Sequence, residues 1–170
     1  ATGGYICASP FPYDGIFRRA VLNFKFHNCG AYAELLSHEM VRSIKDVYRD
    51  RKFDLVTCVP MHKDTLRERG YNQAELLAKE CARLLGIEYA DLLVKTKKNK
   101  TQHSIKAAER AKNVIGVYSP IDKNLIKGKR ILIIDDIITT GSTLGECARI
   151  LNKCKCGEIC CCTLCTSLLI

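Results

Sequence analysis

One short stretch, residues 131–143, constrains the fold of this chain more than any other. It reads Ile-Leu-Ile-Ile-Asp-Asp-Ile-Ile-Thr-Thr-Gly-Ser-Thr. Four consecutive apolar residues predict a buried strand, and the hydroxyl residues around Gly141 predict a tight turn. A helix is expected next, because Thr143 and Glu146 have the spacing of a capping box. The stretch therefore predicts a strand that leads through a turn into a helix, which is typical of α/β folds.

The rest of the chain shows three more helical patterns. Apolar residues at helical spacing predict helices over residues 16–24 and 35–47. Asn72 and Glu75 form a second capping box, for a helix that is expected to end at Gly86. Each of these helices has one apolar face, so each is expected to cover a sheet.

Strands are expected between these helices. A short apolar run over residues 53–59 predicts a buried strand that stops at Pro60, and a charged loop is expected to follow it. The alternation indicates the α/β class, with a mostly parallel central sheet and helices on both faces. We expect a single domain over residues 1–170, with residues 1–12 as the remainder of a linker or an upstream segment. Further strands are expected at residues 89–94, 114–118 and 159–168.

The composition is that of an ordinary soluble domain. The 170 residues are 47% hydrophobic and 26% charged, which provides enough apolar material for one core. No signal peptide is visible, and the longest uncharged apolar stretch, residues 159–170, is too short to span a bilayer. We therefore expect a cytoplasmic protein without membrane insertion. The net charge of +9 leaves nucleic acid, an acidic membrane surface and a small polyanion open as partners.

Eleven cysteines raise the question of disulfides or zinc. The count is odd and no secretory signal is visible, which argues against a disulfide scaffold. Cys154 and Cys156, followed by three consecutive cysteines at residues 160–162, do not have the paired Cys-x-x-Cys spacing of structural zinc sites. The pattern favours cysteine as a small buried residue of a strand, and we expect no dedicated metal site.

Asp135 and Asp136 are the first candidates for function. They stand where the apolar strand runs out, and open α/β sheets bind ligands just beyond the carboxyl ends of their strands. Adjacent carboxylates repel each other, whereas a ribose offers two neighbouring hydroxyls that such a pair can accept from. The turn that follows supplies hydroxyls and backbone N–H groups at a helix N-terminus, which favours a phosphate. Neither a triphosphate P-loop nor a Gly-x-Gly-x-x-Gly motif is present.

Residues 131–143 as a whole resemble the phosphoribosyl pyrophosphate signature of type I phosphoribosyltransferases. The resemblance implies the type I phosphoribosyltransferase fold, with Asp135 and Asp136 as catalytic residues that hold the ribose hydroxyls. It also implies that the turn binds the 5-phosphate. The residues implied in ribose and 5-phosphate binding are Asp135, Asp136, Ile138, Thr139, Thr140, Gly141, Ser142 and Thr143.

The same resemblance implies two further parts of a site. In that fold an earlier strand ends in a loop that binds pyrophosphate, where fixed cations stabilise the leaving group. The candidates in the corresponding place are Pro60, Met61, His62, Lys63, Arg67 and Arg69. The basic stretch at residues 95–112 lies where type I enzymes have a mobile hood that closes over the substrate. The hood candidates are Lys97, Lys100, Gln102, His103 and Arg110.

A second resemblance narrows the family. Arg-Gly-Tyr-Asn-Gln at residues 69–73 is similar to the Arg-Gly-Phe-Asn-Gln string of the competence protein ComF family. Asn-Phe-Lys-Phe at residues 23–26 and the polar residues of 101–113 resemble two other motifs of that family, so the likeness extends over residues 13–166. ComF-like proteins commonly carry an N-terminal zinc ribbon with four cysteines, and no such ribbon precedes Tyr13 in this sequence.

Two functions therefore stay open. The first is a phosphoribosyltransferase of nucleotide metabolism that binds phosphoribosyl pyrophosphate with Mg²⁺, which would bridge ligand oxygens and need no protein cage. It would transfer phosphoribose to a nitrogen acceptor, which the sequence does not identify, and release pyrophosphate. The alternative is a ComF-like accessory protein of DNA uptake that senses the same ligand and binds single-stranded DNA or a protein of the competence machinery. A homodimer is left open in both cases.

Overall fold

The computed structural model describes residues 5–26, 30–97 and 114–168 of the chain. Two short strands, β1 (Cys7–Ala8) and β2 (Phe11–Pro12), come first and are followed by the helices α1 (Gly15–Phe26) and α2 (Gly30–Tyr48). The remaining elements are β3 (Leu55–Cys58), α3 (Lys63–Arg69), α4 (Gln73–Leu85), β4 (Glu88–Tyr89), β5 (Leu93–Lys95), β6 (Tyr118–Pro120), α6 (Lys123–Ile126), β7 (Arg130–Ile138), α7 (Ser142–Lys153) and β8 (Glu158–Thr166).

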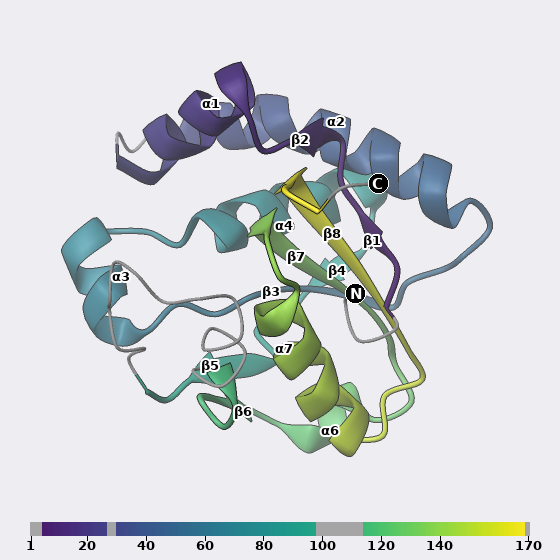
Figure 1. Cartoon of the computed structure of the whole chain (residues 1–170). Coiled ribbons are helices and arrows are strands. Elements are labelled where there is room, and N and C mark those ends of the chain that lie inside the picture. Colours follow the sequence, from purple (N-terminus) through teal and green to yellow (C-terminus); the bar gives the residue numbers. More distant parts are fainter. Residues whose placement is uncertain (1–4, 27–29, 98–113, 169–170) are drawn as a thin grey trace.

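The centre of the fold is a parallel sheet in which β7 lies between β3 and β8 (Figure 1). Its strand order is β1-β8-β7-β3-β4, and β2 also pairs with β8. Every one of these pairings is parallel, and Leu132 of β7 lies opposite Val56 of β3 and Cys160 of β8. The strands β5 and β6 form a separate antiparallel pair. The predicted α/β class with a mostly parallel sheet is confirmed.

Successive residues of the central strands supply two separate cores, because side chains of a strand alternate between its faces. Leu132 and Ile134 pack with Met40 and Leu77 of the helices α2 and α4. On the other face, Ile133 packs with α7, with the β5–β6 pair and with α6. Figure 1 shows α1 and α2 on one side of the sheet and α7 and α6 on the other. Helices therefore cover both faces, as predicted.

Cysteine occupies the interior of the last strand. Four cysteines of β8 are buried, and they fill both faces of the sheet next to β7. This confirms the prediction that cysteine serves as a small apolar residue of a strand; the four are Cys160, Cys161, Cys162 and Cys165.

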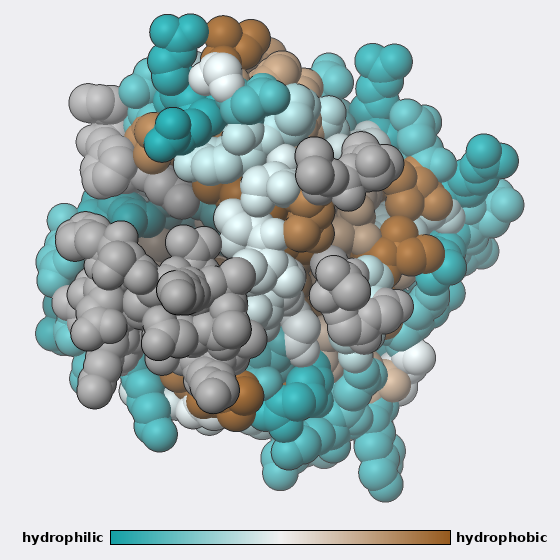
Figure 2. Space-filling view, in the orientation of Figure 1, coloured by the Kyte–Doolittle hydropathy of each residue, from teal (hydrophilic) through white to brown (hydrophobic). Residues whose placement is uncertain are grey.

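The face turned to the viewer in Figure 2 is mostly hydrophilic along its rim, and the apolar side chains that reach it form small patches.

The segment predicted as a charged loop contains a helix, α3. His62 caps it, because its Nδ1 atom accepts a hydrogen bond from the backbone N–H of Asp64 at 3.3 Å. Gly70 ends it in the left-handed region, with φ of 86°. None of its residues is buried. The prediction was wrong because a seven-residue helix without a buried face leaves no apolar periodicity in the sequence.

The strand predicted over residues 89–94 is two strands in different sheets. β4 pairs with β3 at the edge of the central sheet, whereas β5 pairs with β6. Between them the backbone N–H of Leu92 donates to the Thr57 hydroxyl at 3.4 Å, so the chain crosses the end of β3. The extended segment predicted over residues 114–118 contributes only Tyr118 to β6. Short apolar runs do not show where a chain changes sheet.

One of the two predicted capping boxes is wrong. Asn72 does cap α4, and its side chain accepts from the backbone N–H of Ala74 at 3.2 Å. In the described chain, however, α7 begins after Gly141 without a hydrogen bond from a capping side chain. Glu146 is only 5% exposed and accepts instead from the backbone N–H of Gly116 at 2.8 Å and from Arg149. The Glu146 carboxylate thus binds the backbone of a residue far away in the sequence and does not cap its own helix.

Among the helices of the described ranges, none is both long and apolar enough to cross a bilayer.

Asp54 and Arg130 join the start of β3 to the start of β7. The Asp54 carboxylate accepts from the Arg130 backbone N–H at 2.8 Å and from its guanidinium at 2.6 and 3.0 Å. These hydrogen bonds, above all those from the Arg130 side chain, hold the pKa of the Asp54 carboxyl well below its usual range. The pair therefore fixes the register of the two central strands at the end where they begin.

We predict that Asp54→Asn lowers Tm at pH 7 by a few degrees. A depressed folded-state pKa stabilises the protein above the unfolded-state pKa of about 3.9, and this contribution is lost as the pH falls through the folded-state pKa. The difference in Tm between variant and parent should accordingly shrink below about pH 4. Thermal unfolding followed by circular dichroism at pH 7 and pH 3 tests this. Asp50→Asn is the matched control, and a difference that stays constant with pH would contradict the assignment.

Candidate functional site

The strand β7 is longer than its neighbour β3, and the candidate site lies along the overhang. Cys58 ends β3 opposite Ile134. The backbone N–H of Val59 still donates to the Ile134 carbonyl at 2.9 Å, and then the chain turns away toward α3. Asp135 and Asp136 therefore lie inside β7 and not beyond its end as expected from the sequence. From Asp135 onward the strand is paired with β8 alone, so its other edge is open to a ligand.

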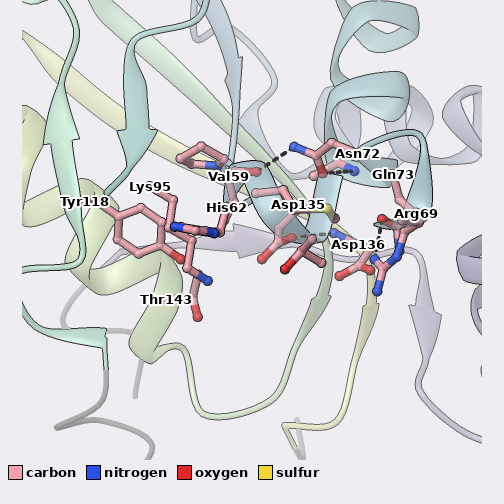
Figure 3. A pocket seen from close by; sticks show the side chains of 14 residues that line it. Val59, His62, Arg69, Asn72, Gln73, Lys95, Tyr118, Asp135, Asp136 and Thr143 are labelled. Carbon is pink, nitrogen blue, oxygen red and sulfur yellow. Dashed lines mark hydrogen bonds between the residues drawn. The ribbon is translucent and has the colours of Figure 1, made fainter. Parts of the chain in front are cut away.

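A cavity of about 260 Å³ lies against this open edge (Figure 3). Its walls come from β7, from the segment between β3 and α4, and from the β5–β6 pair. In Figure 3 the two carboxylates lie between Lys95, Tyr118 and Thr143 on one side and Arg69 on the other. The lining residues are Val59, Pro60, Met61, His62, Thr65, Arg69, Asn72, Gln73, Ala74, Lys95, Tyr118, Asp135, Asp136 and Thr143.

The turn after β7 encloses a second, small hollow of about 30 Å³ that adjoins this site. Asp135 and Thr143 line both spaces. Inside the turn the hydroxyls of Thr140 and Ser142 lie 2.8 Å apart, and Gly141 has φ of 74°, which side chains oppose. The hollow is lined by Asp135, Ile137, Ile138, Thr139, Thr140, Gly141, Ser142, Thr143 and Leu144, so it includes every residue that the sequence assigned to the 5-phosphate.

The hollow also lies at the N-terminus of α7, a helix of twelve residues. Backbone N–H groups of the first turn of a helix lack partners within the helix, and the helix dipole favours an anion there. Hydroxyls, backbone donors and a positive helix end thus surround one small space. This combination of donors is suited to binding an oxyanion such as a phosphate group.

The wall formed by α3 and α4 is held by amide side chains. Asn72 donates from Nδ2 to the Val59 carbonyl at 3.1 Å and caps α4, so it ties the end of β3 to the start of that helix. Arg69 donates to Gln73 Oε1 at 2.8 Å. Gln73 is 1% exposed, and its Nε2 atom has no hydrogen-bond partner among the described residues.

An unpaired buried donor costs roughly 1–3 kcal/mol, and such donors are rare in folded proteins. Because Gln73 lines the cavity and its Nε2 group has no partner among the described residues, this group is a candidate donor to a ligand. The charge of Arg69 on the same wall favours an anion as that acceptor. The sequence showed Gln73 only as part of a family string and gave no sign that its amide is buried.

The opposite wall carries Lys95 and Tyr118. The Lys95 ammonium lies 5.6 Å from the centre of the Tyr118 ring. Burial lowers the pKa of Lys95, and the negative charge of Asp135 only partly opposes this shift. A partly desolvated ammonium gains more from a polyanion than an exposed one does. Lys95 begins the basic stretch that the sequence assigned to the hood, whereas nothing in the sequence singled out Tyr118.

The other predicted site residues are placed as follows. Pro60, Met61, His62 and Arg69 line the cavity. Lys63 and Arg67 are exposed on α3 and do not belong to the described lining. Lys97 is exposed just beyond β5. The remaining hood candidates lie outside the described residues; they are Lys100, Gln102, His103 and Arg110.

A family model for the phosphoribosyl transferase domain matches residues 72–168, from the capping residue of α4 to just beyond β8. The match includes the acid pair, the turn and both amide residues of the α4 wall. The chain belongs to the phosphoribosyl transferase family.

Two curated relatives of this phosphoribosyl transferase chain are competence proteins of the ComF type. Competence protein F of Haemophilus influenzae is 33% identical over 144 residues, which cover 82% of this chain and 63% of the relative. Competence protein ComFC of Bacillus subtilis is 31% identical over 152 residues, 89% of this chain and 60% of the relative. The chain thus spans about 60% of the length of these two relatives.

The solved structures support the fold. A glutamine phosphoribosylpyrophosphate amidotransferase from B. subtilis, in complex with ADP and GMP, superposes with a TM-score of 0.55 at 18% identity. The superposition covers 83% of this chain and 30% of that chain. The type I phosphoribosyltransferase fold expected from the sequence is confirmed.

We predict that Gln73→Met changes the Tm of the ligand-free protein little, because removal of a buried donor without a partner among the described residues offsets the loss of Oε1 as an acceptor for Arg69. The variant should gain less Tm than the parent when phosphoribosyl pyrophosphate, the ligand expected from the sequence, is added with Mg²⁺. Differential scanning fluorimetry measures both. Leu84→Met on the same helix is the control and should respond to the ligand like the parent. A large fall in the ligand-free Tm of Gln73→Met would show that the Nε2 group has a structural partner.

Proposed function

We propose that this protein binds phosphoribosyl pyrophosphate in the cavity beside β7 and transfers its phosphoribosyl group to a nitrogen nucleophile. The observation that carries the proposal is the open edge of β7. It presents two adjacent carboxylates to a cavity with cationic walls, next to a hollow of hydroxyls at a helix N-terminus. A ribose that carries a 5-phosphate and a pyrophosphate matches all three features in one molecule.

Each part of the ligand has a partner in this arrangement. The 5-phosphate would occupy the hollow of the turn, where Thr140 and Ser142 present hydroxyls. The ribose hydroxyls would donate to Asp135 and Asp136. The pyrophosphate would then face the walls that carry Arg69, Gln73 and Lys95, which are the cation and amide donors of the cavity.

A magnesium ion fits this donor set only when the ligand supplies oxygens. Among the described residues no three His, Cys, Asp or Glu side chains are grouped to hold a metal ion. The carboxylates of Asp135 and Asp136 could complete a coordination shell made mostly of phosphate oxygens and water, which is what Mg²⁺ prefers. When bound, the ion would supply charge neutralisation at the departing pyrophosphate.

The residues of the chain would then act by position and charge. The bond between C1 of the ribose and the pyrophosphate oxygen breaks, and its electron pair leaves with the pyrophosphate. The lone pair of the acceptor nitrogen forms the new bond to C1, and the nitrogen loses its proton to solvent. Asp135 and Asp136 would stabilise the positive charge that develops on the ribose ring. Arg69 and Lys95 would stabilise the charge of the leaving group.

A second function rests on the relatives. Two of them are named competence proteins, and this chain carries a net charge of +9. In that case the cavity would act as a sensor of phosphoribosyl pyrophosphate, while cationic surface elsewhere binds single-stranded DNA or a protein partner. Aromatic residues make up only 7% of the chain and Trp is absent, so few stacking platforms are available to single strands. We rank this function second.

We predict that the parent binds phosphoribosyl pyrophosphate with Mg²⁺, whereas Asp135→Asn/Asp136→Asn binds it at least about tenfold more weakly, because hydrogen bonds to charged groups contribute roughly 1.5–3 kcal/mol each. Isothermal titration calorimetry measures both affinities. Asp122→Asn, at the cap of α6, is the control, since asparagine caps a helix as well as aspartate does. Equal affinities of parent and double variant would refute the assignment of the site.

Two further measurements separate the functions. Release of pyrophosphate in a screen of nitrogen acceptors would identify an enzyme. Fluorescence anisotropy with labelled single-stranded DNA over a salt series would reveal the second function as an affinity that falls steeply with salt.

A further inference from the structure

A second hollow, of about 340 Å³, lies at the opposite end of the central sheet, where the strands begin. It is formed by the end of α2, by the segment that leads into β3, by the end of α4 and by Arg130 at the start of β7. Arg130 and Asp136 are six residues apart on one strand, which corresponds to about 20 Å. In Figure 1 the loop after α2 lies at the right of the view, away from α3 and the β5–β6 pair at the left. The hollow is therefore separate from the candidate site.

The hollow has a strongly positive lining. Five basic side chains line it, and no acidic side chain of the described residues does. Two of the five have partners of their own, because Arg51 pairs with Glu158 and Arg130 pairs with Asp54. The other three, Lys45, Arg49 and Lys52, form no ion pair within the described ranges. Three uncompensated positive charges thus converge on one space, which favours a bound anion.

These cations are presented by a well-defined backbone. The Arg49 backbone N–H donates to the Lys45 carbonyl at 2.9 Å, and that of Arg51 donates to the Tyr48 carbonyl at 2.8 Å. Arg49 itself has φ of 41°, so the chain reverses sharply between α2 and β3. The Tyr48 hydroxyl holds this turn against the central sheet, since it donates to the Cys161 carbonyl of β8 at 2.6 Å.

The floor of the hollow is apolar and includes an aromatic ring. Ile44, Leu85 and Ile87 line it together with Phe53. Phe53 is only partly buried, and the Tyr48 ring packs against it edge-on, with 5.7 Å between ring centres and 87° between planes. This contact fixes the orientation of the Phe53 ring. An inorganic anion would leave the apolar floor unused, whereas a phosphate attached to a flat ring system uses both surfaces.

We propose that this hollow is a nucleotide-binding site. The phosphate contacts Lys45, Arg49 and Lys52, and the base lies on Phe53 and the aliphatic side chains beside it. The volume falls within the range of roughly 300–1,000 Å³ that is typical of small-molecule sites. The nucleotide is either a free mononucleotide or one unit of a single strand, since the recognised chemistry is the same in both.

The test is a titration of the full chain with AMP and with a short oligothymidylate, followed by calorimetry. A mononucleotide also carries the ribose 5-phosphate that the cavity beside β7 is proposed to hold, so the titrations are made in the Asp135→Asn/Asp136→Asn background as well as in the parent. Binding at the second hollow should persist in that background. This makes the proposal independent of the proposed function, and either one can fail alone.

We expect Lys45→Glu/Lys52→Glu to weaken nucleotide binding at least about tenfold in both backgrounds, because it replaces two phosphate-binding cations by like charges. Lys123→Glu/Lys127→Glu, two exposed positions of α6 and its C-terminus, is the matched control with the same change in net charge. Phe53→Leu should weaken binding of AMP and leave binding of inorganic phosphate unchanged. The Tm of each variant shows that it is folded.

The outcomes separate clearly. Tighter binding of AMP than of the oligonucleotide, lost in Lys45→Glu/Lys52→Glu, identifies a free nucleotide as the ligand. Tighter binding of the oligonucleotide with the same loss identifies a single strand. Equal weakening by the two double charge variants would overturn the proposal, because it would show that net charge alone attracts the ligand. Nucleotide binding that vanishes in the Asp135→Asn/Asp136→Asn background would overturn it too.

Discussion

The pairing of β7 is the constraint on which the rest of the structure depends. Its first half is hydrogen-bonded to β3 on one edge and to β8 on the other, while its second half is bonded to β8 alone. Because the first half is buried on both faces, the register is fixed, and a slip by one residue would exchange Ile131 and Ile133 with Leu132 and Ile134 between two different cores. The same register leaves Asp135 and Asp136 on the open edge.

The candidate site is costly for the fold by itself. Gln73 buries an Nε2 group that has no partner among the described residues, Lys95 carries its charge into a partly desolvated position, and two carboxylates adjoin on one strand. The first two of these features reduce the stability of the ligand-free protein. The proposed ligand has both hydroxyl donors and negatively charged oxygens, so it would provide partners for all three. Local features that oppose stability and converge on one cavity are typical of a binding site.

The two ends of the central sheet differ in how charge is handled. At the end where the strands begin, Asp54 and Glu158 each neutralise one arginine, and three further cations around the second hollow form no ion pair with the part of the chain that the structure describes. At the other end, acidic and basic groups face each other across the cavity. The long strand β7 connects the two ends, so a cavity lined by both acidic and basic side chains lies at one end and a hollow lined by basic and no acidic side chains of the described residues lies at the other.

The sequence by itself determined the α/β class and the order of strand, turn and helix that begins at residue 131, because these depend on neighbours along the chain. It missed α3 and the change of sheet after β4, and it placed Asp135 and Asp136 beyond the strand. Only the tertiary structure decided that β7 extends beyond the end of β3, and that Glu146 accepts a hydrogen bond from Gly116 and does not cap its own helix. It also decided that Gln73, Lys95 and Tyr118 line one cavity with the two aspartates. These contacts join elements far apart in the sequence, and the packing energies that select them depend on the whole fold.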